Sequence, residues 1–448
     1  MKRKRSTRSL VPSFTVLETR FLLSGAPPGS TAFGSQWGLS NPANNGVDID
    51  ALNAWNLSTG NGVIVADINT DDVGLDNPDL IPNEWSNPAN DPKYPAGIHG
   101  WNFATNKPLT LPTGSDGHDT NILGIIAANP ADPSGPGVTG VAYNTKFMYL
   151  EGVTNNDSAS GIHFAVDHGA KVINLSFDYG EIPSDFAGDQ LYQAIQYADT
   201  KGVVVVVAAG NGGSSGNPSN PGQDDASTTL GPASYGLPNM ITVAMINADG
   251  TLNSGSNFGA TTVQVGAPGN NIYTTGLRSQ GWVFTWAGGT SFAAPFVTGT
   301  AALIEAQAQA KGLTLTAEDV VKRIAQNTKP LASLAGKTTT GGMVDAYFAL
   351  EADAHTNTGG LSLAAGLTTT SGSFTPDTEY TTGGSTYPAP NAIDTTGVSN
   401  PPPQNVLQSE RFDSSGQGFT ETIPGLSPNT PYNNKFAIHL AASGSSMA

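Results

Sequence analysis

Residues 288–299 read G-G-T-S-F-A-A-P-F-V-T-G and continue into an alanine-rich run that ends near Ala308. The apolar pattern predicts that Ser291 lies at the N-terminus of a helix. Free backbone N–H groups and the positive end of the helix dipole favour developing negative charge there. The small neighbours of Ser291 allow a substrate to approach closely. Ser291 is therefore a candidate nucleophile, although a serine in this place could also act only as an N-cap.

Two further segments carry residues suited to the same chemistry. The sequence D-G-H-D-T at 116–120 precedes an apolar run, which puts His118 near the start of a second helix, where a neutral imidazole could serve as a base. In A-A-G-N-G at 208–212, Asn211 follows a buried strand, and its amide could donate to an oxyanion. Each pattern alone is also typical of an ordinary turn.

Short apolar runs alternate with helical patterns between about residues 50 and 350. Near-continuous apolar runs, as expected of strands covered on both faces, occur at 63–66, 147–150, 171–175, 203–209 and 240–244. Helical patterns occupy 158–169 and 189–201. This alternation predicts an α/β fold with a parallel sheet between helices. The ligand crevice of such a sheet lies beyond the carboxyl ends of its strands.

Together, these segments resemble the subtilisin-like serine peptidases over about residues 35 to 350, and the serine motif G-T-S-x-A-x-P is complete here. The resemblance implies a three-layer α/β/α domain with a mainly parallel sheet. It also implies a serine endopeptidase that hydrolyses proteins, with Ser291 as nucleophile, His118 as general base and Asn211 as side-chain oxyanion donor. Leu175, Ser176 and Phe177 match the strand that lines the substrate cleft.

The position of the catalytic acid departs from the family pattern. When V-I-V-A-D-I-N-T at 63–70 is laid on that pattern, Asn69 stands where the acid belongs. Asp67 lies two residues earlier on the same face of the strand, about 6.5 Å deeper. A register that starts at Asp72 fits D-[ST]-G-[IV]-D but shortens the spacing to the Pro-Asp-Leu at 78–80. We favour Asn69 and keep Asp72 and Asp67 as alternatives.

Two other motifs are also altered. The family's H-G-T-H-V-A-G is H-D-T-N-I-L-G at 118–124, and Asp178 stands where a glycine usually lets the substrate backbone approach. Asp119 is not expected to replace the acid, because consecutive helical residues point about 100° apart. A carboxylate at position 178 should disfavour ordinary extended peptides.

These departures leave two functions open. Replacing the triad acid by asparagine lowers the rate of a serine peptidase by about 10⁴, because the histidine is held in the wrong tautomer. An enzyme with Asn69 in the acid position would be slow rather than inert. The alternative is a catalytically impaired pseudopeptidase that acts as a binding or surface protein.

Composition excludes several other classes. The 448 residues carry a net charge of −17, which argues against nucleic acid and anionic membrane as partners. No cysteine is present, so disulfides, thiolate zinc sites and a cysteine nucleophile are excluded. The longest apolar run, 203–209, is far shorter than the roughly 20 residues of a membrane span. No cofactor is required by the resemblance; calcium is common in the family as a structural ion, and the acidic loop at 71–79 could bind it, but no ligand spacing assigns a metal site.

The two ends of the chain differ from its centre. Residues 2–8 are rich in Lys and Arg, and L-E-T-R-F-L-L-S at 17–24 resembles the bacterial N-terminal motif L-E-P-R-x-L-L-S, which heads exported proteins. Residues 361–448, including S-F-T-P-D-T at 373–378 and Q-S-E-R-F at 408–412, resemble the first part of a malectin-like β-sandwich, a family that often binds carbohydrate. We expect that β domain to be small and incomplete.

The predicted organisation follows from these boundaries. Residues 1–30 form a targeting segment, 31–350 the peptidase domain, 351–360 a linker and 361–448 the partial β domain. The predicted location is secreted or at the bacterial cell surface, and the predicted partners are a protein or peptide substrate and, through the C-terminal region, carbohydrate.

Overall fold

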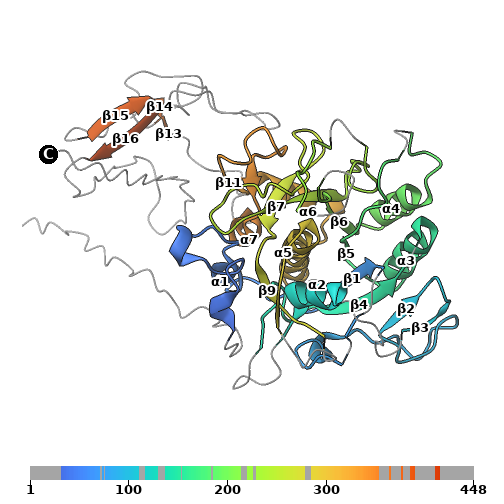
Figure 1. The fold of residues 1–448 in the computed structure, drawn as a ribbon. Coiled ribbons are helices and arrows are strands. Elements are labelled where there is room, and N and C mark those ends of the chain that lie inside the picture. The colour runs from blue at the N-terminus through green and yellow to red at the C-terminus, as the bar shows by residue number, and fades with distance from the viewer. Residues whose placement is uncertain are drawn as a thin grey trace, which may run out of the picture. The chain divides into compact units, whose positions relative to one another are not determined.

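The computed structural model describes residues 32–352 except 71–72, 75, 110–116, 130–136, 153, 183–184, 213–218, 226–228 and 278–283, together with four short strands beyond residue 352. The chain divides into two compact units between Ala352 and Asp353. The N-terminal motif at 17–24 lies outside the described residues. The first unit contains the described candidate site residues (Figure 1).

A ten-stranded sheet forms the centre of the first unit, in the order β11-β12-β8-β7-β6-β5-β1-β4-β2-β3. Its strands are β1 (Ile64–Asn69), β2 (Gly100–Asn102), β3 (Lys107–Pro108), β4 (Lys146–Glu151), β5 (Val172–Leu175), β6 (Val204–Ala208), β7 (Met240–Ile246), β8 (Val265–Pro268), β11 (Lys329–Pro330) and β12 (Gly342–Met343). All pairs are parallel except β2 with β3 and β11 with β12, at the two edges. The predicted mainly parallel sheet is confirmed.

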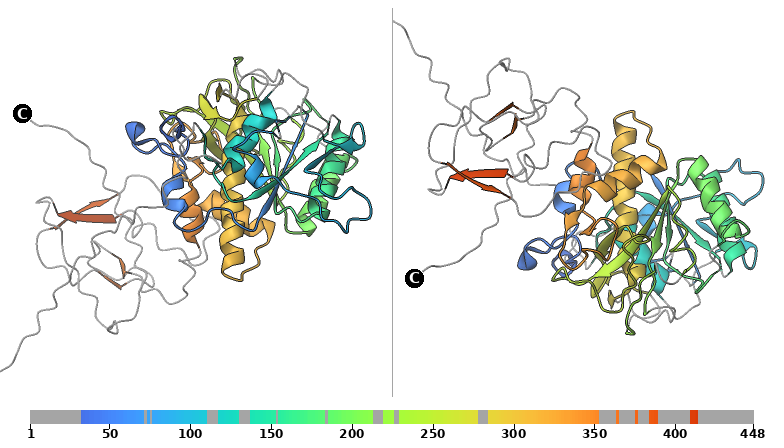
Figure 2. Two further views of the ribbon diagram at one scale, coloured as in Figure 1. Left: turned by 90° about the horizontal axis from the view of Figure 1, so that it is seen from below. Right: turned by 90° about the horizontal axis from the view of Figure 1, so that it is seen from above.

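Helices cover both faces of the sheet (Figures 1 and 2). One apolar cluster joins α3 (Asn155–Asp167) and α4 (Gln190–Thr200) to one face. A larger cluster joins the other face to α1 (Ala51–Ala54), α2 (His118–Ala127), α5 (Thr290–Ala310), α6 (Ala317–Gln326) and α7 (Ala346–Glu351). Short 3₁₀ turns at Phe33–Ser35, Pro42–Asn44 and Ile81–Asn83 and a hairpin of β9 (Ile272–Thr274) with β10 (Thr285–Ala287) complete the unit.

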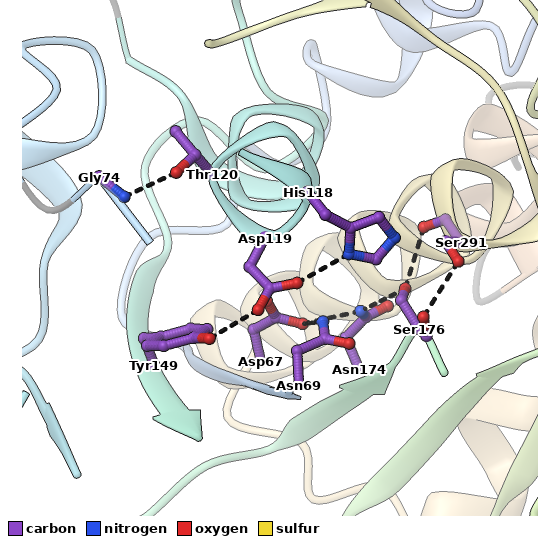
Figure 3. A network of polar contacts seen from close by, with 10 residues as sticks. All are labelled: Asp67, Asn69, Gly74, His118, Asp119, Thr120, Tyr149, Asn174, Ser176 and Ser291. Carbon is purple, nitrogen blue, oxygen red and sulfur yellow. Dashed lines mark hydrogen bonds and ion pairs between the residues drawn. The ribbon is translucent and has the colours of Figure 1, made fainter. Parts of the chain in front are cut away.

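Strand alternation decides which side chains face α2 and α5. Ala66 and Ile68 pack with α3 and α4, whereas Val65 packs on the opposite face. Because side chains alternate along a strand, Asp67 and Asn69 point to the same side as Val65, towards α2 and α5. The sheet therefore presents polar groups to the helix layer that carries His118 and Ser291 (Figure 3).

Helix α3 begins earlier than its apolar pattern predicts. Thr154 and Asp157 form a reciprocal capping box in which each side chain accepts from the other residue's backbone N–H. This pairing satisfies two backbone donors and starts the helix at Asn155, three residues before the predicted start at 158. The capping signal, rather than the apolar period, sets the boundary.

The second unit contains two short strand pairs, each described by itself. β13 (Leu363–Ala364) pairs in parallel with β14 (Thr375–Pro376), and β15 (Gly384–Pro388) pairs antiparallel with β16 (Ser409–Asp413). The remaining residues of the malectin-like region lie outside the described residues, so that resemblance stays a prediction. Among the helices that the structure describes, none combines the length and hydropathy of a membrane span.

A close approach fixes α2 against the β9 segment. A Cβ on Gly124 would lie 2.1 Å from Thr275 Oγ1 and 2.5 Å from Thr274 Oγ1. Both hydroxyls donate to carbonyls of α2, Thr274 to Asn121 and Thr275 to Thr120. Only a glycine lets the helix that carries His118 lie this close to the hairpin.

We therefore expect Gly124→Ala to lower the free energy of unfolding by about 1–3 kcal/mol, because overpacking forces the helix away from its hydrogen-bond partners. Urea unfolding of both proteins measures the loss. Gly34→Ala is the matched control, since nothing lies within 4 Å of a Cβ there. Equal midpoints for the Gly124 and Gly34 variants would contradict the packing argument.

Candidate active site

The N-terminus of α5 positions Ser291, and a proline four residues later explains how. Pro295 has no N–H, so the Ser291 carbonyl lacks its usual helical donor. The hydroxyl of Ser176 donates to that carbonyl instead, at 2.9 Å, and Ser291 Oγ donates to the Ser176 carbonyl at 3.0 Å (Figure 3). This reciprocal pair joins the start of α5 to the residue that follows β5.

Asn211 approaches the same helix start from the end of β6. Its Oδ1 accepts from the backbone N–H of Thr290 at 2.9 Å and from the Thr290 hydroxyl at 3.3 Å. The Thr290 hydroxyl in turn accepts from the N–H of Gly210 at 3.1 Å. Because its carbonyl oxygen is held by these donors, the amide orientation is fixed, and Nδ2 is the group left to donate at the helix N-terminus.

His118 is the first residue of α2, and its Nδ1 lies 2.8 Å from Asp119 Oδ1. The geometric reason for setting Asp119 aside, that its side chain points away from His118, is therefore wrong. Cβ directions of consecutive helical residues do diverge, but Nδ1 is the ring nitrogen nearest the backbone, and a carboxylate on the next residue reaches it. The ring of Phe292, next to Ser291, contacts the imidazole edge to face at 5.3 Å between centroids.

Both carboxylate oxygens of Asp119 are occupied. Oδ1 faces His118, and Oδ2 accepts from the hydroxyl of Tyr149 at 2.6 Å (Figure 3). Asp119 is fully buried and lies in the first turn of α2, where the helix dipole favours a negative charge. Burial and the Asp119 carboxylate raise the pKa of Tyr149 well above its usual value, so the phenol remains a donor.

Asp67 lies beneath this pair, in the middle of β1. It is the register partner of Tyr149 on β4 and of Asn174 on β5. Its Oδ1 accepts from Asn174 Nδ2 at 2.8 Å and from Asn69 Nδ2 at 3.1 Å. Burial, followed by the charge of Asp119, raises the pKa of Asp67 to about 8. At neutral pH Asp67 is therefore mainly protonated.

A chain of polar contacts links Asp67 to the serine. Besides Asp67, Asn174 Nδ2 donates to Ser176 Oγ at 2.9 Å, and its Oδ1 accepts from Thr298 of α5 at 2.8 Å. Ser176 continues the chain to the Ser291 carbonyl. These buried hydrogen bonds therefore fix the position of α5 relative to β1 and β5.

The other predicted site residues have definite places. Asn69 is buried at the end of β1 and donates to Asp67. Leu175 packs with α3 and α4, and Phe177 is half-buried beside it. Asp72 lies outside the described residues.

Sequence reasoning missed three supporting groups: Asp119, Tyr149 and Thr298. Tyr149 and Thr298 sit in apolar runs that read simply as core. Their partners come from distant segments, so no local pattern pointed to them. For Asp119 a signal existed, namely an acid in the first turn directly after the candidate base.

Calcium is the structural ion that the family resemblance suggests, and the described residues offer no carboxylate or histidine ligand set for it. Within the ranges described above, no three His, Cys, Asp or Glu side chains come together as a metal site. In the acidic loop, Asp79 Oδ2 accepts from the backbone N–H of Val138 at 3.0 Å. Asp71 and Asp72 lie outside the described residues, so calcium binding stays a prediction.

Comparison with known families identifies this arrangement. The subtilase family model matches residues 60–372, which is more than half of the chain. The chain belongs to the subtilase family of serine peptidases. The serine, histidine and asparagine segments, which meet beyond the carboxyl ends of the central strands, are the ones on which the sequence resemblance rests.

Individual serine proteinases are similar in sequence to this chain. Thermitase from Thermoactinomyces vulgaris is 31% identical over 309 residues, which cover 68% of this chain and 94% of thermitase. A thermophilic serine proteinase from Bacillus sp. (strain AK1) is 34% identical over 307 residues. That match covers 66% of this chain and only 64% of the Bacillus protein.

Solved subtilase structures share the fold. A protease from Pseudoalteromonas arctica superposes with a TM-score of 0.56 at 25% identity, covering 73% of this chain and 99% of that protease. Fervidolysin from Fervidobacterium pennivorans, a keratinolytic enzyme related to subtilisin, gives a TM-score of 0.54 at 26% identity over 72% of this chain and 46% of fervidolysin. The subtilisin-like α/β fold is confirmed.

The raised pKa of Asp67 predicts that the stability of the protein depends on pH. Folding takes up a proton at Asp67 between its ordinary pKa near 3.8 and its folded pKa of about 8. Stability should therefore fall as pH rises through this window. Asp67→Asn keeps an acceptor for Asn69 and Asn174 and removes the titration, so it should raise the free energy of unfolding at pH 7 to 8 by on the order of a few kcal/mol.

Urea unfolding of the wild type and Asp67→Asn at pH 5 and pH 8 measures this effect. The gain should be larger at pH 8 than at pH 5. Asp249→Asn, on the exposed surface, serves as the control carboxylate. A gain that is the same at both pH values would mean that Asp67 does not titrate in the folded protein.

Proposed function

We propose that the protein is a working serine endopeptidase in which Asp119, rather than a residue at the end of β1, orients the catalytic histidine. The observation that carries the proposal is the 2.8 Å contact between His118 Nδ1 and Asp119 Oδ1. An ionised acid on Nδ1 fixes the tautomer in which Nε2 can accept a proton, which is what a triad requires of its third member.

The chemistry follows from these positions. Ser291 Oγ attacks the carbonyl of a peptide bond while His118 Nε2 takes its proton, and the imidazolium is stabilised by the ionised Asp119. The oxyanion forms at the N-terminus of α5, within reach of backbone N–H groups and Asn211 Nδ2. His118 then returns the proton to the leaving amine, and water completes hydrolysis by the reverse sequence.

Substrate binding is assigned to the end of β5. Leu175 is paired with both neighbouring strands and supports the segment from inside the sheet, so we assign main-chain pairing with an extended peptide to the residues that follow β5, Ser176 and Phe177. The link between Ser176 and Ser291 supports this role, because it places the peptide's carbonyl beside the nucleophile.

A disabled peptidase that binds without cleaving is the second candidate. The observation in its favour is that Ser291 Oγ donates to the Ser176 carbonyl, so the hydroxyl must rotate before it can donate to His118. Catalytic hydrogen bonds often tighten only in the substrate complex, which is why we favour the enzyme.

The remaining proposals concern the two ends of the chain. We propose export to the cell surface or medium on the strength of the basic residues 2–8 and the motif at 17–24. Carbohydrate binding by residues 361–448 and a structural calcium ion remain expectations from resemblance, and purified protein can be tested for each separately.

Asp119→Asn should lower kcat/KM on an unfolded protein substrate by about 10⁴, because asparagine leaves His118 in the wrong tautomer. The assay uses the full chain, with Ser291→Ala as the blank and Asp249→Asn as the control. Circular dichroism checks that Asp119→Asn remains folded. Activity within tenfold of the wild type would reject Asp119 as the orienting acid.

Asn69→Asp should not raise activity. The new carboxylate would replace the amide that donates to Asp67 and would add a third acid beside Asp67 and Asp119. Buried like charges repel, so we expect this variant to lose about 1–3 kcal/mol in urea unfolding. A clear increase in kcat/KM would instead make position 69 the natural place of the acid and the wild type a disabled enzyme.

A further inference from the structure

The contact between His118 and Asp119 depends on the orientation of one carboxylate. The two residues are consecutive in α2, and side chains of consecutive helical residues leave the axis about 100° apart. The Asp119 carboxylate must therefore adopt one particular orientation to bring Oδ1 within 2.8 Å of His118 Nδ1. The last torsion of an aspartate side chain has a broad energy well, so it does not fix that orientation by itself. A partner outside the helix is the natural candidate for fixing it.

Tyr149 supplies such a partner from the sheet. Its hydroxyl donates to Asp119 Oδ2 at 2.6 Å, while Oδ1 of the same carboxylate faces the imidazole (Figure 3). One oxygen is thus held from the sheet, and the other is presented to His118. Burial, followed by the Asp119 carboxylate, raises the pKa of Tyr149 well above its usual value. The phenol therefore keeps its proton, and its role as a donor, throughout the neutral pH range.

The phenol has little freedom to move. Tyr149 is fully buried and lies in β4, between β1 and β2. Its register partners are Asp67 on β1 and Gly100 on β2. A Cβ on Gly100 would collide with the carbonyl oxygen of Tyr149, so the neighbouring strand packs directly against this residue. The sheet therefore dictates where the hydroxyl lies.

We propose that Tyr149 is a positioning residue of the active site, which holds the Asp119 carboxylate against Nδ1 of His118. The inference rests on the proposed peptidase function and deepens it. Tyr149 acts on the histidine through Asp119, so its removal should disturb the proton transfer rather than the binding of substrate. In this arrangement β4 anchors the orienting acid, while α2 carries it.

Tyr149→Phe removes the hydroxyl and keeps the ring. We expect kcat on an unfolded protein substrate to fall about 10- to 100-fold with little change in KM, because a misplaced catalytic group can cost about 10²-fold. The acid limb of the pH profile should move to lower pH by about one pH unit, since an imidazolium that loses its carboxylate contact is less stable. An unchanged kcat, or an acid limb at the wild-type pH, would overturn the proposal.

Tyr235→Phe is the matched control. Tyr235 is also buried, and its hydroxyl donates at 2.7 Å to Oδ2 of Asp189, the N-cap residue of α4. Both variants therefore take a buried tyrosine hydroxyl away from an aspartate at the start of a helix, and urea unfolding checks that both remain folded. Only Tyr149→Phe should change kcat and the acid limb. Equal changes in the two variants would indicate a general loss of rigidity and reject a specific role for Tyr149.

A double variant asks whether Tyr149 acts through Asp119. In the Asp119→Asn background the hydroxyl has no carboxylate to hold, so adding Tyr149→Phe should lower kcat/KM by less than about threefold further, as expected of two residues that act as one unit. A further loss as large as that of Tyr149→Phe alone would show that the hydroxyl acts by another route, contrary to the proposal.

A spectroscopic measurement separates this proposal from the proposed function. Ser291→Ala protein, which cannot cleave, is prepared with isotope-labelled histidine, and His118→Gln in that background assigns the His118 ring signals. Tyr149→Phe should lower the pH midpoint of the His118 titration by about one pH unit, whereas Tyr235→Phe should leave it in place. If the wild type cleaves nothing but this shift is seen, the peptidase proposal fails and the positioning role stands. A midpoint that does not move overturns the positioning role, whether or not the enzyme is active.

Discussion

The reciprocal hydrogen bonds between Ser176 and Ser291 are the constraint on which the active site depends. They join the residue after a buried strand to the first turn of the helix that crosses the same face of the sheet. Pro295 makes the link necessary by leaving the Ser291 carbonyl without a helical donor. Because Asn211 holds the preceding residue, Thr290, the helix start is fixed from two strands at once.

The helices on this face of the sheet also supply hydrogen-bond partners to a polar network that is buried in the apolar core. Asp67, Asn174 and Thr298 lie among residues of the larger cluster, yet most of their polar atoms find partners. The exception is Asp67 Oδ2, which has no partner among the described atoms. Protonation of Asp67 reduces the cost of that unpaired atom, and the neighbouring carboxylate of Asp119 is contacted by His118 and Tyr149.

These contacts explain why asparagine fits at position 69, where the family has its acid. The family places its acid at the end of the first strand; here that place holds the amide of Asn69, which donates to Asp67, and the carboxylate that contacts His118 is that of Asp119 on α2. A carboxylate therefore lies beside the histidine, although it is carried by α2 and not by β1.

The sequence by itself determined the elements and the three segments of the site. Apolar runs placed β1, β4, β5, β6 and β7, and the serine motif put Ser291 at the start of α5, because period and composition are local properties of the chain. The tertiary structure alone decided which acid contacts His118, since that depends on how an imidazole and a carboxylate turn within one buried space. Pairings such as Tyr149 with Asp119 join residues thirty positions apart. No spacing in the sequence encodes such a contact, because it follows from strand register and the packing of α2 on the sheet.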